Sequence, residues 1–186
     1  MVSTNDFKTG MTIEYNGDIY QILSFQHIKP GKGQAFVHSS IKNLRTGSTI
    51  TYNFRPDLKL KKAIIEKKEM QYIYNTSDTY SFMDNETYVQ LDIPASRLEW
   101  EKQFMLEGTM VTIIQYETEI LGVQLKEKVP LEVSECDPGV KGNTAANARK
   151  KATLETGYIL EVPLFINKGD KIIVSTIDGS YSSRDK

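Results

Sequence analysis

The sequence predicts an all-β protein that is divided into three small barrels. Short runs of β-branched and aromatic residues recur along the chain, separated by turns that contain glycine, asparagine or aspartate. The best helical segment is short and is confined to residues 94–105. A chain of 186 residues has room for several such units, because domains run from about 50 to 250 residues.

The first barrel is predicted from two hairpins. Asn16-Gly17 lies between strand-like residues 12–15 and 19–25, and Asn-Gly is among the strongest short hairpin signals. Arg45-Thr46-Gly47 separates residues 35–44 from residues 49–54 in the same way. Short antiparallel strands within about 60 residues are typical of an SH3-like barrel. We assign it residues 1–64, with residues 55–62 as a basic connector.

The other two barrels follow the same pattern. In residues 65–128, a short amphipathic helix over 94–105 offers Leu98, Phe104 and Met105 to one face, and about five strands with a small helix form the OB plan. Residues 129–186 suggest another small all-β barrel. The expected strands of these two barrels are residues 70–74, 79–83, 88–91, 110–115, 119–125, 129–133, 152–156, 158–166 and 171–177.

The net charge of −1 hides an uneven distribution. Residues 1–64 hold 9 Lys or Arg against 4 Asp or Glu, and residues 65–128 hold 6 against 12. Residues 129–186 hold 8 of each. A basic first part and an acidic middle indicate a basic face that meets phosphate.

The most distinctive loop is Pro30-Gly31-Lys32-Gly33-Gln34, which joins two predicted strands. Glycine tolerates positive φ, so the pair around Lys32 permits a tight turn with the lysine at its tip. Pro30 fixes its own φ and stiffens the approach to the tip. The loop by itself fits two interpretations: a cationic arm that reaches a charged target, or an ordinary hairpin with a solubilising lysine.

The residues that could support catalysis or metal binding are few. His27 and His38 lack the companions of a metal motif, and Gly31-Lys32-Gly33 is not a phosphate-binding P-loop. Cys136 lies between two acidic residues, which disfavours a reactive thiolate. The chain has neither a membrane-length apolar run nor a secretory signal, and one cysteine allows no internal disulfide. We therefore expect a cytoplasmic monomer without metal, cofactor or membrane partner.

Features suited to RNA are better represented. Small β-barrels bind RNA by combining positive charge with aromatic rings. In the last part, Arg149-Lys150-Lys151, Tyr181 and Arg184 offer cations beside rings. Alternation favours core positions for Tyr20, Phe36, Tyr52, Tyr158 and Phe165. The cations of the first part are Lys29, Lys32, Lys42, Arg45, Arg55, Lys59, Lys61 and Lys62.

With these residues in view, the chain resembles the bacterial elongation factor P family nearly from end to end. Residues 5–10 followed by 29–36 carry the resemblance, as does the segment 82–88. Residues 150–169 match a family pattern of Lys-x-Ala, four residues, Gly, then Val-Pro and a closing Gly. Residues 178–184 complete the match.

The resemblance implies a fold and a function. The fold would be one SH3-like (KOW-type) barrel and two OB-fold barrels in an L that mimics tRNA. Such factors bind the 70S ribosome between the P and E sites, contact rRNA and relieve stalling at consecutive prolines. They are not enzymes. Lys32 would reach along the P-site peptidyl-tRNA towards the peptidyl-transferase centre, supported by Pro30, Gly31, Gly33 and Gln34.

The resemblance also implies further sites. In many family members the tip residue carries a covalent extension, so Lys32 is the candidate for modification by a lysine-modifying enzyme. The loop Gly142-Asn143-Thr144 would approach the E-site codon, although the family often has Asp where this chain has Asn143. Two alternatives remain open: a paralogue with other stalling targets and a generic OB-type RNA-binding module. The residues expected to bind tRNA or rRNA are Lys29, Lys42, Arg45, Arg55, Tyr181 and Arg184.

Overall fold

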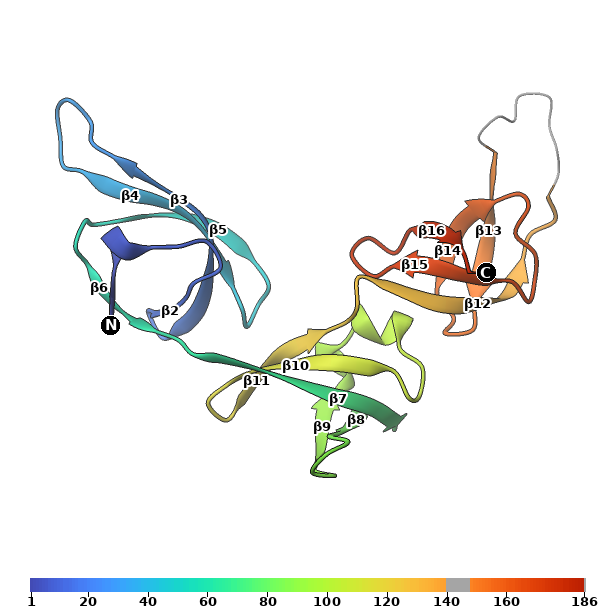
Figure 1. Ribbon diagram of the computed structural model, residues 1–186. Coiled ribbons are helices and arrows are strands. Elements are labelled where there is room, and N and C mark those ends of the chain that lie inside the picture. The colour runs from blue at the N-terminus through green and yellow to red at the C-terminus, as the bar shows by residue number, and fades with distance from the viewer. Residues whose placement is uncertain (140–147, 186) are drawn as a thin grey trace. The chain divides into compact units, whose positions relative to one another are not determined.

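The computed structural model describes residues 1–139 and 148–185 and builds them mainly as antiparallel strands (Figure 1). These strands form three sheets, so the all-β prediction is confirmed. The chain divides into two compact units, one of Met1–Lys68 with Ile113–Gly122 and one of Glu69–Thr112 with Val123–Lys186. The predicted domain limits of residues 1–64, 65–128 and 129–186 stay predictions.

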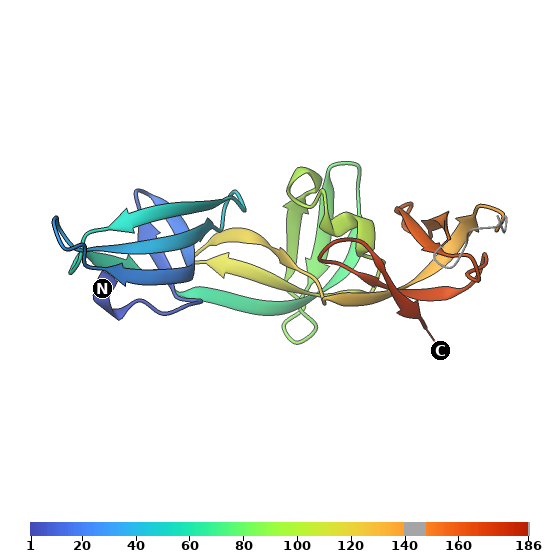
Figure 2. The same cartoon turned by 90° about the horizontal axis from the view of Figure 1, so that it is seen from above.

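The first sheet has the strand order β1-β6-β2-β3-β4-β5 and curls around an apolar core (Figures 1 and 2). Along β4, Val37 and Ile41 are buried, whereas His38 and Lys42 are exposed, as expected for alternating side chains. Phe7 joins this core from outside the strands. The strands are β1 (Val2–Ser3), β2 (Thr12–Tyr15), β3 (Asp18–Ile28), β4 (Phe36–Asn43), β5 (Thr49–Phe54) and β6 (Lys59–Lys62).

Both predicted turns of the first barrel are confirmed. Asn16 and Gly17 have φ of +50° and +82°, the two positive values that a type I′ hairpin turn requires. At the second turn, the side-chain oxygen of Asn43 accepts the backbone N–H groups of Arg45 (2.8 Å) and Thr46 (3.1 Å). The predicted connector at residues 55–62 is wrong in part, because β6 pairs there with β1 and β2.

The first unit has a second, smaller core where β10 (Met110–Tyr116) and β11 (Glu119–Gln124) meet it. Ile19, Ala63, Tyr116 and Leu121 are buried together. The Tyr116 hydroxyl donates to a carboxylate oxygen of Glu14 (3.1 Å). The unit thus includes a hairpin that lies far along the chain from the first barrel.

The second sheet has the strand order β11-β10-β7-β8-β9. Its longest strand, β7 (Ile65–Asn75), begins in the first unit and continues into the second. The remaining strands are β8 (Thr79–Met83) and β9 (Gln90–Pro94).

The predicted helix over residues 94–105 is correct in its buried face but wrong in its type. Two short 3₁₀-helices, η2 (Ala95–Arg97) and η3 (Glu101–Phe104), replace a continuous α-helix. Leu98, Phe104 and Met105 are buried, as their spacing predicts. Pro94 precedes the segment, and Leu98 to Trp100 separate two turns that are each too short to continue as an α-helix.

The third sheet has the strand order β14-β13-β12-β15-β16 around its own core. No strand was predicted after residue 177, but Tyr181–Arg184 form β16, which pairs with β15. Two aromatic residues that were expected in the core are exposed. Phe165 of this part is 60% exposed, and Tyr52 on β5 of the first sheet is 38% exposed. The strands are β12 (Lys128–Cys136), β13 (Arg149–Leu154), β14 (Ile159–Pro163), β15 (Lys171–Ser175) and β16 (Tyr181–Arg184).

Trp100 fixes the η2–η3 segment to the third sheet within the second unit. Its indole N–H donates to the backbone oxygen of Thr176 (2.7 Å). The Phe104 ring lies 5.1 Å from that of Trp100 and 4.9 Å from that of Tyr158. Gly179 has φ of +72°, and a Cβ placed there would lie 2.0 Å from the Tyr158 hydroxyl.

We expect Gly179→Ala to destabilise the protein at this aromatic contact. Overpacking costs about 1–3 kcal/mol and a left-handed backbone about 1–2 kcal/mol, so the free energy of unfolding should fall by about 2–5 kcal/mol. Gly169→Ala is the matched control, because Gly169 has φ of +87° but no atom within 4 Å of its Cβ position. Urea unfolding followed by the fluorescence of the single tryptophan measures both. Equal losses in the two variants would contradict the steric argument.

Asp170 should make stability depend on acidic pH. The N–H of Asn167 (2.9 Å) and the guanidinium of Arg184 (2.8 Å) lower the pKa of this carboxyl. Its stabilising effect is therefore complete above the unfolded pKa of about 3.9 and disappears as pH falls through the lower folded pKa. Urea midpoints between about pH 6 and pH 2.5 should fall less steeply for Asp170→Asn than for the unaltered chain. Parallel curves would show that this carboxyl is not responsible.

Candidate nucleic-acid interface

The β3–β4 hairpin carries the predicted loop. The two strands stay paired as far as Ile28 and Phe36, so residues 29–35 form the loop between them. Figure 1 shows this end of the hairpin projecting beyond the rest of the first barrel. Every residue from 29 to 34 is exposed, and Ala35 is half-buried. The loop therefore extends beyond the last β3–β4 pair, and β5 pairs with β4 as far as Phe54 opposite Val37.

The two glycines of the loop have different roles. Gly33 has φ of +123°, a backbone conformation that other residues rarely adopt. The Pro30 ring lies 3.6 Å from the Cβ position of Gly33, which closes the loop on itself. Gly31 lacks positive φ, and a Cβ there would meet open space. Only Gly33 is thus required by backbone geometry.

Lys32 lies between these glycines. Within the described residues, its ammonium group has no hydrogen bond or ion pair, and its side chain is exposed. A lysine ammonium is a compact point charge on a flexible four-carbon stem. Like Lys29 in the same loop, Lys32 is therefore an exposed cation that forms no ion pair with a carboxylate of the described residues.

Aromatic and polar contacts hold the base of the hairpin. The Phe25 ring makes edge contacts with His27 (5.8 Å between centroids) and with Phe7 (6.3 Å). On the other strand, Nδ1 of His38 lies 2.6 Å from the side-chain oxygen of Asn53. Both histidines therefore have contacts with neighbouring side chains of the protein.

Three of the six residues expected to bind RNA are exposed and unpaired on the first unit. Lys29, Lys42 and Arg55 make no ion pair with any residue that the structure describes. Lys42 lies on β4, where it faces away from the core. These side chains remain available for phosphate.

Arg45 is already engaged by carboxylates. Its guanidinium binds both oxygens of Glu119 (2.9 and 2.8 Å) and one oxygen of Asp18 (2.9 Å). These bonds raise the pKa of Arg45. Lys61 lies similarly close to Glu14 (2.9 Å), and that bond is the main cause of the lowered pKa of Glu14. Both cations have carboxylate partners within the first unit, so their positive charge is largely offset there.

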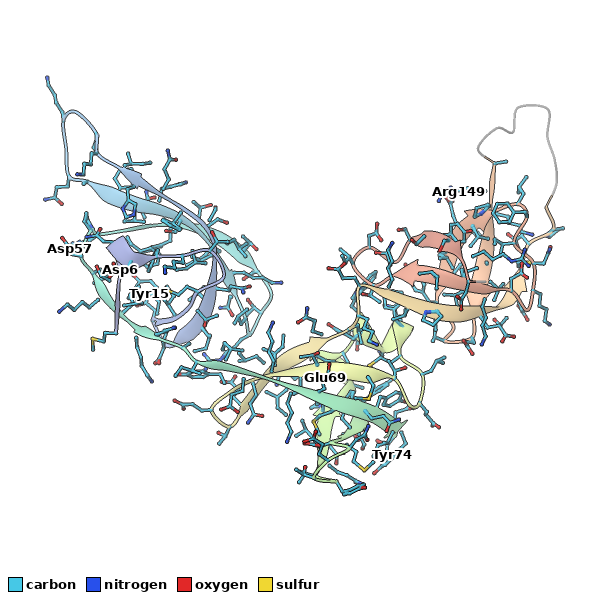
Figure 3. The ribbon with its side chains drawn as sticks, in the orientation of Figure 1. Asp6, Tyr15, Asp57, Glu69, Tyr74 and Arg149 are labelled. Carbon is cyan, nitrogen blue, oxygen red and sulfur yellow. The ribbon has the colours of Figure 1, made fainter. Side chains whose placement is uncertain are left out.

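The third sheet offers fewer free groups than its sequence suggests. Tyr181 is half-buried against the core, and Arg184 is paired with Asp170 (2.8 Å). Arg149 is exposed at the start of β13, as Figure 3 shows. The predicted codon loop Gly142-Asn143-Thr144 lies outside the described residues.

The described part of the chain contains no cluster of side chains that could hold a metal ion. None of its helices has the length and apolar character needed to cross a membrane.

Three family descriptions match consecutive parts of the chain. The KOW-like domain of elongation factor P matches residues 3–60, and the OB domain of the same factor matches residues 65–123. The C-terminal domain of elongation factor P matches residues 129–184. The predicted KOW-type and OB folds are confirmed by these matches.

One curated relative gives the same family assignment. Elongation factor P of Phytoplasma australiense is 51% identical over 186 residues, which are all of this chain and 98% of that protein. A translation initiation factor eif-5a family protein from Naegleria fowleri is 17% identical and covers 67% of this chain and 96% of its own, with a TM-score of 0.51, so it supports the fold alone. A structure described as eukaryotic translation initiation factor 5A from Methanococcus jannaschii is 23% identical and covers 66% of this chain and 94% of its own, with a TM-score of 0.48.

Given these matches along its whole length, the chain belongs to the elongation factor P family: it is a translation elongation factor that works with the ribosome, and it is not an enzyme.

Proposed function

We propose that the chain binds the 70S ribosome between the P and E sites and stimulates peptide-bond formation when consecutive prolines stall it. The observation that carries this proposal is Lys32, an exposed cation that forms no ion pair with any described residue, in the loop at the tip of the β3–β4 hairpin. A hairpin has the width of two strands, about 5 Å apart. Such an arm suits a narrow channel lined with RNA.

The proposed mechanism is positional. A stalled peptidyl-tRNA samples unproductive geometries, and holding reacting groups in place removes an entropic part of the barrier. Lys32 would contact the acceptor end of the P-site peptidyl-tRNA, and Pro30 with Gly33 would keep the loop closed. No side chain of the factor enters the bond-forming step, which agrees with a translation factor that has no cofactor.

The free cations of the first unit support RNA contact along the arm. Lys29, Lys42 and Arg55 are exposed, and phosphate neutralisation by such groups dominates non-specific affinity for nucleic acids. We include tRNA and rRNA among the partners on this basis. Contact with the E-site codon through Gly142, Asn143 and Thr144, and action as a cytoplasmic monomer, belong to the same proposal.

Covalent extension of Lys32 by a lysine-modifying enzyme is a further part of the proposal. The loop offers a modifying enzyme an exposed lysine between two small residues, without a competing ion pair among the described residues. An extension would lengthen the arm at its tip while leaving the barrel unchanged.

Replacing Lys32 with Ala should abolish the rescue of polyproline synthesis in a reconstituted translation assay. The melting temperature should stay unchanged, because the side chain is exposed and makes no described contact. Lys171→Ala removes an exposed lysine of β15 and serves as the control that keeps full activity. Full rescue by Lys32→Ala would sink the proposed mechanism.

The same reagents separate this function from its alternatives. A generic RNA-binding module would bind free RNA as tightly as it binds ribosomes that hold a P-site tRNA, and its binding would decline steeply with salt. A paralogue would rescue stalling sequences other than consecutive prolines, so a panel of stalling sequences is included in the assay.

The intact mass of the protein from its native host should exceed that of the 21.1 kDa unmodified chain. Peptide mapping should assign the whole excess to Lys32, and Lys32→Arg purified from the same host should lose it. An intact mass equal to that of the unmodified chain would remove this part of the proposal.

A further inference from the structure

One arginine links three turns of the first unit. Arg45 lies in the β4–β5 turn, and its guanidinium donates to the backbone oxygen of Gly17 and to a carboxylate oxygen of Asp18 (2.9 Å) at the β2–β3 turn. The same guanidinium donates to Glu119, from Nε to both carboxylate oxygens (2.9 and 3.2 Å) and from Nη2 to one of them (2.8 Å). Glu119 begins β11, directly after the turn of the β10–β11 hairpin. Such two-pronged arginine–carboxylate contacts have a defined geometry.

A second group of contacts joins this hairpin to the first barrel. The Tyr116 hydroxyl donates to Glu14 of β2 (3.1 Å), and the Lys61 ammonium of β6 lies 2.9 Å from the same carboxylate oxygen. Lys61 also lies 3.9 Å from a carboxylate oxygen of Glu117 and 6.0 Å from the centre of the Tyr116 ring. Three of the four residues 116–119 therefore have polar contacts with the barrel.

Apolar packing accompanies these polar contacts. Tyr116 and Leu121 of the hairpin are buried together with Ile19 of the barrel. Isolated surface ion pairs contribute little to stability, but bidentate geometry and networks of several charges contribute more. Apolar burial has no preferred direction, whereas hydrogen bonds do. The buried residues thus attach the hairpin to the barrel, and the charged groups define the angle between them.

These contacts lie at the base of the arm that carries Lys32. β3 begins at Asp18, and β4 ends at Asn43, two residues before Arg45, while the loop joins the opposite ends of the two strands. The 11 residues of β3 span up to roughly 35 Å at about 3.3 Å per residue. A rotation of the barrel by about 10° at this base would therefore move the tip by up to about 6 Å. Catalysis by positioning is sensitive to displacements of about 1 Å.

We propose that Arg45 and Glu119 are positioning residues, whose bonds hold the barrel at one angle on the β10–β11 hairpin and so direct the Lys32 arm. This inference rests on the proposed function of Lys32. β10 and β11 continue into the second unit, so the hairpin connects the barrel to the rest of the factor. A loosened barrel would hold the binding-competent orientation for only a fraction of the time, and the apparent affinity for the ribosome would fall by that fraction.

The test measures the polyproline translation rate of the full chain as a function of factor concentration. Glu119→Gln and Arg45→Gln should each raise the half-saturating concentration about two- to fivefold and leave the saturating rate unchanged. Arg45→Lys keeps the charge without the two-pronged geometry and should lie between Arg45→Gln and the unaltered chain. The double variant should be no worse than Arg45→Gln alone, because both changes break one interaction. Lys102→Ala, which breaks an ion pair with Glu99 (2.9 Å), is the control and should have no effect.

Glu119→Gln separates positioning from direct contact with RNA. If Arg45 instead bound phosphate, its release from Glu119 would leave the half-saturating concentration unchanged or lower it, and either result would overturn the proposal. Lys32→Ala should have the other kinetic effect, the loss of the saturating rate. Failure of the Lys32 mechanism is therefore seen in the saturating rate, and failure of this inference in the half-saturating concentration.

Positioning can also be measured without a ribosome. In a Cys136→Ser background, nitroxide labels on cysteines introduced at Thr51 of the first barrel and Glu107 of the second unit, both exposed, report a distance distribution by double electron–electron resonance. The distribution should be broader for Glu119→Gln and Arg45→Gln than for the unaltered chain, with circular dichroism showing that each variant is folded. Equal widths would overturn the proposal, and so would a broader distribution at an unchanged half-saturating concentration.

Discussion

The antiparallel pairing of β3 with β4 is the constraint on which the first barrel and its site both depend. Its inner part brings Ile22 opposite Ile41 in the core. The register shifts between Ile22 and Ser24, and such a bulge bends and twists a strand. Beyond it the same two strands continue to the loop around Lys32. The position of the lysine is therefore determined by packing inside the barrel, although the lysine itself contacts none of it.

Much of this arrangement follows from the sequence, because hairpins are specified locally. Asn16-Gly17 and Arg45-Thr46-Gly47 lie between strands whose observed limits differ from the predicted ones by only a few residues. Strand β6 and the 3₁₀ segments were harder to predict, since β6 is basic and mostly exposed and finds its partners far away in the chain. Tyr52 was expected in the core, yet it lies on the edge strand β5, where one side has no neighbouring strand to cover it.

At the candidate site, the sequence also does not predict which charged side chains form ion pairs. Lysines and arginines of the first part look equivalent in the sequence, but Arg45 is bound by Glu119, 74 positions away. No local pattern encodes that pairing. The structure thus separates cations with carboxylate partners, such as Arg45, from Lys29, Lys32 and Lys42, which form no ion pair with any described residue. The number of charged residues in the sequence predicts that the first unit has a basic face. Tertiary contacts determine which cations on that face are left without an ion pair.

Two turns of this chain each contain a residue with positive φ, and the two residues are of very different size. At the β3–β4 loop the positive φ falls on Gly33, which has no side chain to strain, and the neighbouring Lys32 is displayed. At the β8–β9 turn it falls on Tyr88, although glycine would be easier there. The first solution minimises bulk around a cation, as a narrow RNA channel demands. The second keeps a large ring exposed, although the left-handed backbone is unfavourable for a bulky residue.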